Sequence, residues 1–557
     1  MKLSVFNRIF GITIVFFFIQ FSVSAQELDI NAVYQSAIKA YDSKNYNEAS
    51  NQFSILINKV GFKIQNTGVY YNGACIYALN NQPKKALELL NHLVNDKLYS
   101  NYKHISRDGD LNSLHTSSQW DEIIDKVKTN LITLPERNRK TIKNRLSEAK
   151  KLLDNDNGSL WGENIWHTDF LIIDYDSNIY SLKPITGFKT TDSILFYSKI
   201  KNNELSFTNS VQEYKGKKYA TILNNYLKGK STTLIHELFH TLQFKHKEFN
   251  GNPVSYLDNY DARQWLRLEY QALRLTLQSI SNNEDLEKIK LHLNDALIFR
   301  KLRQIKYKEH LKNELELETL EGLANYTGIK LSAIENKYEE AIHQINEREV
   351  AETYTRPFPY ATGPAYGLVF DYLNIDWKKG LDVIYNFLEI YEAKIVKKEI
   401  VLSNTYILQA KERNNYERIH QEELSKKTRK EDLINFYTKM LIDSPTLSVT
   451  SIDEKYGRTY NMNGTISLDE DRTIFSSIKG TAKSKEDFGN FYIKDGKLGK
   501  TGILGTWIGD VLKFTFPLPK RIEGNKIIGD FYELEFNKGW EIVKINDKGS
   551  LEIRKMK

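Results

Sequence analysis

Two histidines and a glutamate stand at a spacing that suits a metal ion. The segment His236-Glu237-Leu238-Phe239-His240 separates the histidines by four positions. On a helix this spacing directs both imidazoles from one face, so they can share one ion. Glu237 lies beside them, where a carboxylate can hold and deprotonate a metal-bound water. The motif therefore predicts a metal site on a helix with hydrolytic chemistry.

The same letters also fit a plainer interpretation, a helix with two partly buried histidines and no ion. Ile235, Leu238 and Phe239 supply the apolar faces that seat such a helix in a core, and both interpretations need them. A purely structural site gains nothing from Glu237. The complete His-Glu-x-x-His pattern therefore favours a zinc hydrolase.

Beyond this motif, the sequence resembles the gluzincin metallopeptidases. In that clan a later helix supplies a glutamate ligand, often in a Glu-Gly-small-Ala segment followed by an aromatic residue, and residues 321–326 read Glu-Gly-Leu-Ala-Asn-Tyr. The resemblance implies that Glu321 completes a His, His, Glu ligand set for zinc, with the fourth position left to water. Residues 359–363, Pro-Tyr-Ala-Thr-Gly, resemble the Pro-Tyr-x-x-Gly segment of the aminopeptidase branch. Tyr360 is therefore expected to steady the oxyanion of the tetrahedral intermediate.

The sequence departs from the clan in the length of the segment before Glu321. Eighty residues, 241–320, separate it from the histidine helix, so a helical insertion must be assumed. That insertion holds a competing ligand, Glu269, on a strongly patterned helix. Its plainer interpretation is a surface or core-edge glutamate paired with Arg267 or Arg274. The glycine after Glu321 and the downstream tyrosine favour Glu321, but the choice between the two glutamates stays open.

Three further residues near the motif carry weaker signals. Glu318, one turn before Glu321, could orient a histidine or could equally be a solvated charge. His167 and His246 have no spacing that marks them as ligands, so a surface or packing role is expected for both.

The Gly-x-Met-Glu-Asn strand that binds a free amine in related aminopeptidases is missing. The chain has four methionines, at positions 1, 440, 462 and 556, and none supplies it. Endopeptidase action is at least as well supported as aminopeptidase action.

Length and composition indicate a folded protein of several domains. A chain of 557 residues is too long for one hydrophobic core, so two to four domains are expected. Hydrophobic residues make up 41% and charged residues 27%, which is ordinary for a folded soluble protein. The 78 basic and 71 acidic residues are scattered, without a dense basic block, so nucleic acid is not an expected partner.

The N-terminus has the layout of a secretory signal peptide over residues 1–25. Lys2 and Arg8 form a basic start, residues 9–23 are nearly all apolar, and Ala25 ends a stretch of small residues. An uncleaved anchor is the alternative, but the apolar run is short of the roughly 20 residues that span a bilayer. No second long apolar segment follows, so the mature chain is expected to have no membrane span.

The single cysteine, Cys75, limits the cellular compartments in which the protein is expected. It excludes an internal disulfide framework, and it stands too far along the chain to be the lipid-modified cysteine of a lipoprotein. An exported protein with almost no cysteine suits a bacterial periplasmic or secreted protein.

Residues 26–133 are expected to form a helical domain with a weak repeat. Ala49 and Ala86 occupy corresponding places in two helix pairs and lie 37 residues apart, slightly more than a tetratricopeptide unit of about 34. Pro83 suits the first turn of its helix. Residues 108–127 could form a third unit. This segment resembles tetratricopeptide-type hairpins, which would offer a docking surface for a protein partner or simply pack on the catalytic domain.

The remainder is expected to form two domains, which makes the whole chain an α+β multidomain protein. Residues 134–444 are expected to be a mostly helical zinc metallopeptidase domain with a small sheet. Strands are expected at residues 165–180 and 194–207, and helical stretches at 135–155, 258–279, 284–326 and 331–349. Residues 445–557 are expected to form a β-sandwich or barrel, with alternating strands at 511–516 and 532–536 and a hairpin turn at Asp495-Gly496.

Two functions from different classes fit the sequence. The first is an exported zinc peptidase that acts on a peptide or protein substrate, with Glu237 as general base. The second is a non-catalytic envelope protein that binds a partner, with a structural or vestigial zinc site.

Overall fold

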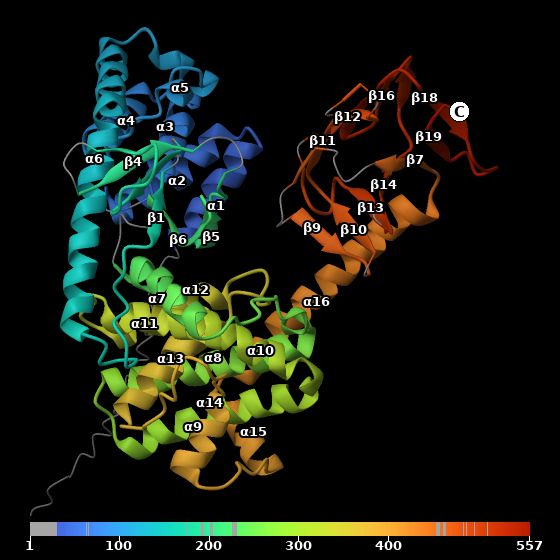
Figure 1. Cartoon of the computed structure of the whole chain (residues 1–557). Helices are drawn as coiled ribbons and strands as arrows, with labels where there is room; N and C mark the ends of the chain where they lie inside the picture. The colour runs from blue at the N-terminus through green and yellow to red at the C-terminus, as the bar shows by residue number, and fades with distance from the viewer. Residues whose placement is uncertain are drawn as a thin grey trace, which may run out of the picture. The chain divides into compact units, whose positions relative to one another are not determined.

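The computed structural model describes most of the chain after its N-terminal segment. The described residues are 30–62, 64, 66–174, 177–190, 194–200, 204–224, 231–452, 457–460, 464–469, 471–482, 484–485, 487–494, 496–509 and 511–556. The expected signal peptide lies outside them. Helices dominate up to residue 443 and strands follow from residue 446 (Figure 1). The chain is thus an α+β protein with several cores, as the sequence predicts.

The chain divides into two compact units between Lys143 and Asn144. Helix α6 (Ser118–Asp156) runs through this division without a break. It contains the expected helix at 135–155, and the expected domain boundary at 133/134 falls inside it.

Paired helices build the first unit. Its elements before α6 are α1 (Ile30–Asp42), α2 (Tyr46–Val60), α3 (Thr67–Leu79), α4 (Pro83–Asn95), α5 (Tyr102–Ile105) and the 3₁₀ helix η1 (Gly109–Leu114). Helices α1 and α2 pack together, as do α3 and α4. Ala49 and Ala86 are fully buried, and Pro83 opens its helix as expected. Residues 108–127 hold η1 and the start of α6, not a further pair of α-helices.

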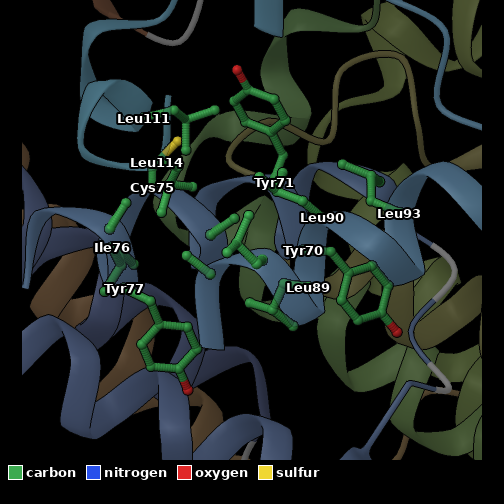
Figure 2. Packing of buried hydrophobic residues seen from close by; sticks show 14 of the residues in the cluster. Tyr70, Tyr71, Cys75, Ile76, Tyr77, Leu89, Leu90, Leu93, Leu111 and Leu114 are labelled. Atoms are coloured by element: carbon green, nitrogen blue, oxygen red, sulfur yellow. The ribbon is translucent and has the colours of Figure 1, made fainter. Parts of the chain in front are cut away.

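One hydrophobic cluster holds these helices together. Figure 2 shows Tyr70 and Cys75 of α3 beside Leu90 of α4, with Leu111 and Leu114 of η1 over the same core. All five side chains are at most 3% exposed. Cys75 is therefore an interior packing residue of the first unit.

A six-stranded sheet precedes the histidine helix in the second unit. Its strands are β1 (Phe170–Ile173), β2 (Asn178–Ser181), β3 (Lys189–Thr190), β4 (Phe196–Lys199), β5 (Ser210–Tyr214) and β6 (Lys217–Leu223). Their order is β3-β4-β2-β1-β6-β5, with β1 and β6 parallel and the other pairs antiparallel. The expected strands at 165–180 and 194–207 are present as β1, the start of β2, and β4. The hairpin of β5 and β6 was not expected.

Helices follow the sheet from Thr232 onward. They are α7 (Thr232–His246), η3 (Ser255–Asp258), α8 (Tyr260–Ser281), α9 (Leu286–Lys306), η4 (Lys308–His310), α10 (Leu311–Leu317), the π-helix η5 (Glu318–Gly322), α11 (Leu323–Leu331), α12 (Lys337–Glu349), α13 (Pro359–Tyr372), α14 (Phe387–Tyr391), η6 (Glu392–Val396), α15 (Asn404–Arg413), α16 (Tyr416–Thr438) and η7 (Lys439–Asp443). The single stretch expected at 284–326 is therefore several elements.

The long insertion between the histidine helix and Glu321 is a helical hairpin. Helices α8 and α9 pack along each other and carry buried charges. Arg300 and Arg303 of α9 are fully buried and bond to Glu269 of α8 and to Glu314 and Glu318. Such charges are tolerated in a core because each has a partner.

Two sheets, in which most neighbouring strands are antiparallel, complete the chain. The first has the order β18-β19-β7-β14-β13-β10-β9 and the second β15-β16-β17-β12-β11-β8. Their strands are β7 (Thr446–Ile452), β8 (Gly457–Tyr460), β9 (Thr465–Ser467), β10 (Arg472–Phe475), β11 (Ile478–Thr481), β12 (Gly489–Ile493), β13 (Ile503–Ile508), β14 (Val511–Pro517), β15 (Arg521–Glu523), β16 (Lys526–Ile528), β17 (Tyr532–Phe536), β18 (Trp540–Lys544) and β19 (Leu551–Lys555).

Both sheets contribute to one hydrophobic core, with Phe514 of β14 against Phe491 of β12. Asp495 lies outside the described residues. The hairpin expected there is wrong, because β12 before it and β13 after it belong to different sheets.

No helix in the described part of the chain combines the length and apolar character needed to cross a bilayer.

Candidate metal centre

Helix α7 positions the residues of the His-Glu-x-x-His motif. Most of its apolar side chains, among them Ile235, Leu238 and Phe239, are fully buried. The Phe239 ring packs on Trp161 with ring centroids 5.2 Å apart. Burial on these sides fixes the rotation of the helix, so His236 and His240 point from the remaining face.

Glu321 meets the two histidines from the π-helix η5. Its Oε2 lies 3.5 Å from Nε2 of His236 and 3.4 Å from Nε2 of His240, and the two Nε2 atoms are 3.0 Å apart. A tetrahedral ion with ligand bonds of about 2.0–2.2 Å separates its ligand atoms by roughly 3.3–3.5 Å. Glu321 Oε2 therefore lies from each histidine at the separation expected of zinc ligands, while the two Nε2 atoms, at 3.0 Å, are slightly closer together. The His, His, Glu combination suits zinc chemically.

Charge holds this triad together. Burial alone would raise the pKa of Glu321, yet hydrogen bonds from His236 and His240 hold it well below its usual value. Burial alone would lower the pKa of His240, but Glu321 raises it to about 9. The three side chains are each less than 10% exposed. A cation at their centre would satisfy the buried carboxylate in place of a proton.

Glu237 lies beside the triad in the same cavity. Its side chain is buried, and burial raises its pKa, while the neighbouring histidines oppose that shift. A carboxylate whose pKa is raised toward neutrality is a stronger base than an exposed one.

Tyr360 reaches the triad from the first turn of α13. Its ring stacks on His236, with centroids 5.7 Å apart and planes 9° from parallel, and its hydroxyl donates to Glu321 Oε2 at 2.6 Å. Burial and the charge of Glu321 raise the pKa of Tyr360 above its ordinary value. The phenol therefore stays protonated and remains a hydrogen-bond donor.

Two arginines stand at the rim of this site. Arg356 Nη2 lies 3.5 Å from Glu321 Oε1, and its Nη1 donates to the Gly251 carbonyl at 2.9 Å. The Arg348 guanidinium lies 5.6 Å from the centre of the Tyr360 ring. Neither arginine was predicted from the sequence, because both belong to segments far from the motif.

The motif residues open into a cavity of about 860 Å³. Helices α7, α12 and α13 and the η5 turn contribute most of its lining, and β5 contributes Ser210 and Val211. Strand β5 is one of the two edge strands of its sheet, paired only with β6 among the described strands. The cavity thus has histidines and carboxylates on one side and an open sheet edge on another.

Glu269, the competing ligand, and Glu318 both lie outside the triad. Glu269 is fully buried and accepts hydrogen bonds from Arg300, Arg303 and Tyr366, so its partners are not the expected Arg267 or Arg274. Glu318 is neither a histidine partner nor a solvated charge: both of its oxygens bond to Arg300, and Thr362 donates to it.

The other two histidines near the motif are outside the triad. His246 pairs with Glu163 at 2.6 Å. His167 accepts a hydrogen bond from the Asp169 backbone N–H at 3.0 Å, and burial lowers its pKa to about 4. Both act as packing or surface residues.

One polar residue of α7 was also missed. Gln243 follows His240 by three positions and hydrogen-bonds to its ring. The spacing of three on a helix was a signal that could have found it.

Comparison of the chain with protein-family models, curated proteins and solved structures found no match. The geometry of the site therefore carries the functional argument alone.

Proposed function

We propose that this chain is a zinc-dependent peptidase of the gluzincin type, with His236, His240 and Glu321 as the zinc ligands. The observation that carries the proposal is the convergence of these three donors, with separations of 3.0–3.5 Å, in a cavity that also holds Glu237. Zinc bound there would supply a Lewis acid that polarises a carbonyl and activates water at neutral pH.

Glu237 is the proposed general base. Its carboxylate takes a proton from the attacking water and delivers it to the nitrogen of the leaving amine. Its place next to the ligands on α7 favours this role over that of a further ligand. A structural zinc site would have no use for a buried carboxylate whose pKa is raised.

Tyr360 is the proposed donor to the oxyanion. Its protonated hydroxyl turns from Glu321 Oε2 toward the oxygen on which negative charge develops. The stacking on His236 keeps the ring at the site while the hydroxyl changes partner.

An extended peptide is the substrate that this cavity favours. The free edge of β5 offers backbone N–H and C=O groups to a strand laid along it, and Ser210 and Val211 place that edge in the cavity wall. A second hollow neighbours the cavity, and Glu340 and His343 of α12 line both. A peptide longer than a few residues would reach both hollows.

The domain identities belong to the same proposal. Residues 144–444 would form the peptidase domain, the helical hairpins of the first unit a tetratricopeptide-like docking domain, and residues 445–557 a β-sandwich. Residues 1–25 would direct export from a bacterial cell.

Metal removal and return tests the proposal. The purified chain should contain about one zinc per molecule by elemental analysis and should cleave a mixed library of quenched fluorescent peptides. A chelator should abolish cleavage and added zinc should restore it. Absence of zinc binding, or cleavage that persists after zinc is removed, would exclude the proposed mechanism.

A further inference from the structure

Gln243 connects the histidine helix to the turn that carries Glu321. The side chain is 1% exposed, and each end of its amide has one partner. Gln243 Oε1 lies 2.9 Å from His240 Nδ1, and Gln243 Nε2 donates to the Thr319 carbonyl at 2.9 Å. Thr319 stands two residues before Glu321 in η5. One buried side chain thus contacts a ligand from α7 and the backbone that presents a ligand from η5.

The Thr319 carbonyl determines which way the amide points. A carbonyl oxygen can only accept a hydrogen bond, so the amide group that faces it must be the NH₂. The amide oxygen must then face His240, and because it too can only accept, Nδ1 of His240 must carry a proton. The reverse amide orientation would place two acceptor oxygens 2.9 Å apart.

This protonation pattern has a direct consequence for the metal. A neutral imidazole with its proton on Nδ1 has its lone pair on Nε2. In His240 that atom faces His236 Nε2 and Glu321 Oε2, at 3.0 and 3.4 Å. In the neutral, metal-binding form of the ring that lone pair therefore points to the centre of the proposed ligand set.

We propose that Gln243 is a positioning residue of the metal site. Its hydrogen bond to His240 holds that ring in the Nδ1–H tautomer, which sets the zinc affinity, and its hydrogen bond to the Thr319 carbonyl orients the amide and stabilises the packing of α7 on the η5 turn. Thr319 is itself held, since its hydroxyl accepts from the Tyr385 backbone N–H at 2.9 Å. This role rests on the proposed zinc site, on which Gln243 acts through His240.

Replacement of the amide by an apolar chain of similar length tests the inference. Gln243→Met removes both hydrogen bonds, so the zinc dissociation constant should rise about 10- to 100-fold. Competition with a chelator of known affinity measures it, and thermal unfolding of the zinc-free protein shows whether the variant folds. Gln278→Met, at an exposed position of α8, is the matched control and should leave zinc affinity unchanged.

A second variant tests the two hydrogen bonds of the amide separately. Gln243→Glu keeps an oxygen for His240 Nδ1–H but presents another oxygen to the Thr319 carbonyl. Zinc affinity should stay within about threefold of the wild type, whereas the zinc-free protein should unfold at a lower temperature. If Gln243→Met fails to fold, the zinc affinity of Gln243→Glu tests the inference.

The outcomes distinguish the inference from the proposed function. If the wild type binds no zinc, the proposed function fails. If the wild type binds zinc and Gln243→Met binds it equally well, Gln243 has only a structural role and the inference is overturned. A Gln243→Glu variant that loses zinc affinity tenfold or more also overturns it, because an acceptor on Nδ1 would then not be the determinant.

Discussion

Gly363 packs directly on Gly322, so closely that a Cβ added at position 363 would lie 2.3 Å from the Gly322 Cα. The two glycines mark the crossing of α13 over the η5 turn. Tyr360 is one turn before the crossing on α13, and Glu321 is next to it on η5. The crossing therefore sets the 2.6 Å contact between the Tyr360 hydroxyl and the Glu321 carboxylate.

Gly363→Ala should separate these two elements. The added methyl group meets backbone, which cannot rotate away, so we expect a loss of about 1–3 kcal/mol in the free energy of unfolding together with weaker zinc binding. Urea unfolding and zinc titration measure the two effects. Gly109→Ala is the control, because its nearest neighbour would be a side-chain atom at 3.8 Å. A Gly363→Ala variant as stable as that control would show that the crossing is not tight.

Arg300 should be essential to the stability of the second unit. Its guanidinium is fully buried and donates to Glu269 at 2.7 Å and to both oxygens of Glu318 at 2.6 and 2.7 Å. Arg300→Met would leave both carboxylates buried without this partner. The expected loss is about 3–5 kcal/mol in the free energy of unfolding, measured by denaturant titration.

An exposed arginine provides the comparison for Arg300. Arg429→Met, on the exposed surface of α16, should change the free energy of unfolding by less than about 0.5 kcal/mol. Equal effects of the two substitutions would contradict the structural role given to the buried ion pairs.

Tyr360→Phe should separate catalysis from metal binding. The variant keeps the ring that stacks on His236 but lacks the hydroxyl. We expect zinc content to be unchanged and kcat to fall about 10²- to 10³-fold, as for loss of an oxyanion donor. Tyr372→Phe, on the same helix and partly exposed, should keep full activity. A Tyr360→Phe variant with wild-type kcat would remove Tyr360 from the mechanism.

His167 should make the fold sensitive to acid. The ordinary histidine pKa of 6.5 applies to the unfolded chain, whereas burial lowers the pKa of His167 to about 4 in the folded chain. Between these values the unfolded state binds more protons, so stability falls as the pH falls. His167→Asn keeps an acceptor for the Asp169 N–H and removes this titration.

The loss of stability between about pH 7 and about pH 4.5 should therefore be smaller in His167→Asn by about 2–3 kcal/mol. Urea unfolding at the two pH values measures it. An identical loss in both proteins would show that His167 is not buried in its neutral form.

Local patterns in the sequence were enough to predict many of the helices and strands but not where they contact one another. The spacing of His236 and His240 is set within one helix, and the buried apolar side chains around them have the same helical period. The change to strands after residue 445 is likewise a change of period. These features depend only on residues close to one another in the chain, so a single sequence is enough to predict them.

Long-range partners could not be predicted in this way. The choice between Glu269 and Glu321 depended on the positions of Arg300 and Arg303. These arginines lie on α9, the helix that follows the one carrying Glu269. Arg356 contacts Glu321, 35 positions away, and Gln243 contacts the Thr319 carbonyl, 76 positions away. No periodicity encodes such contacts, which arise only when the helices pack.

The central claim is that Glu237 serves as a base beside a metal that other residues hold. Glu237→Gln keeps the size of the side chain and removes the charge, so the variant should bind zinc as the wild type does and lose peptide cleavage by about 10²- to 10⁴-fold. The control variant Glu309→Gln, at an exposed glutamate, should retain both zinc binding and peptide cleavage. Full zinc content with cleavage lost is the result expected; a Glu237→Gln variant that cleaves peptides at the wild-type rate would contradict the account.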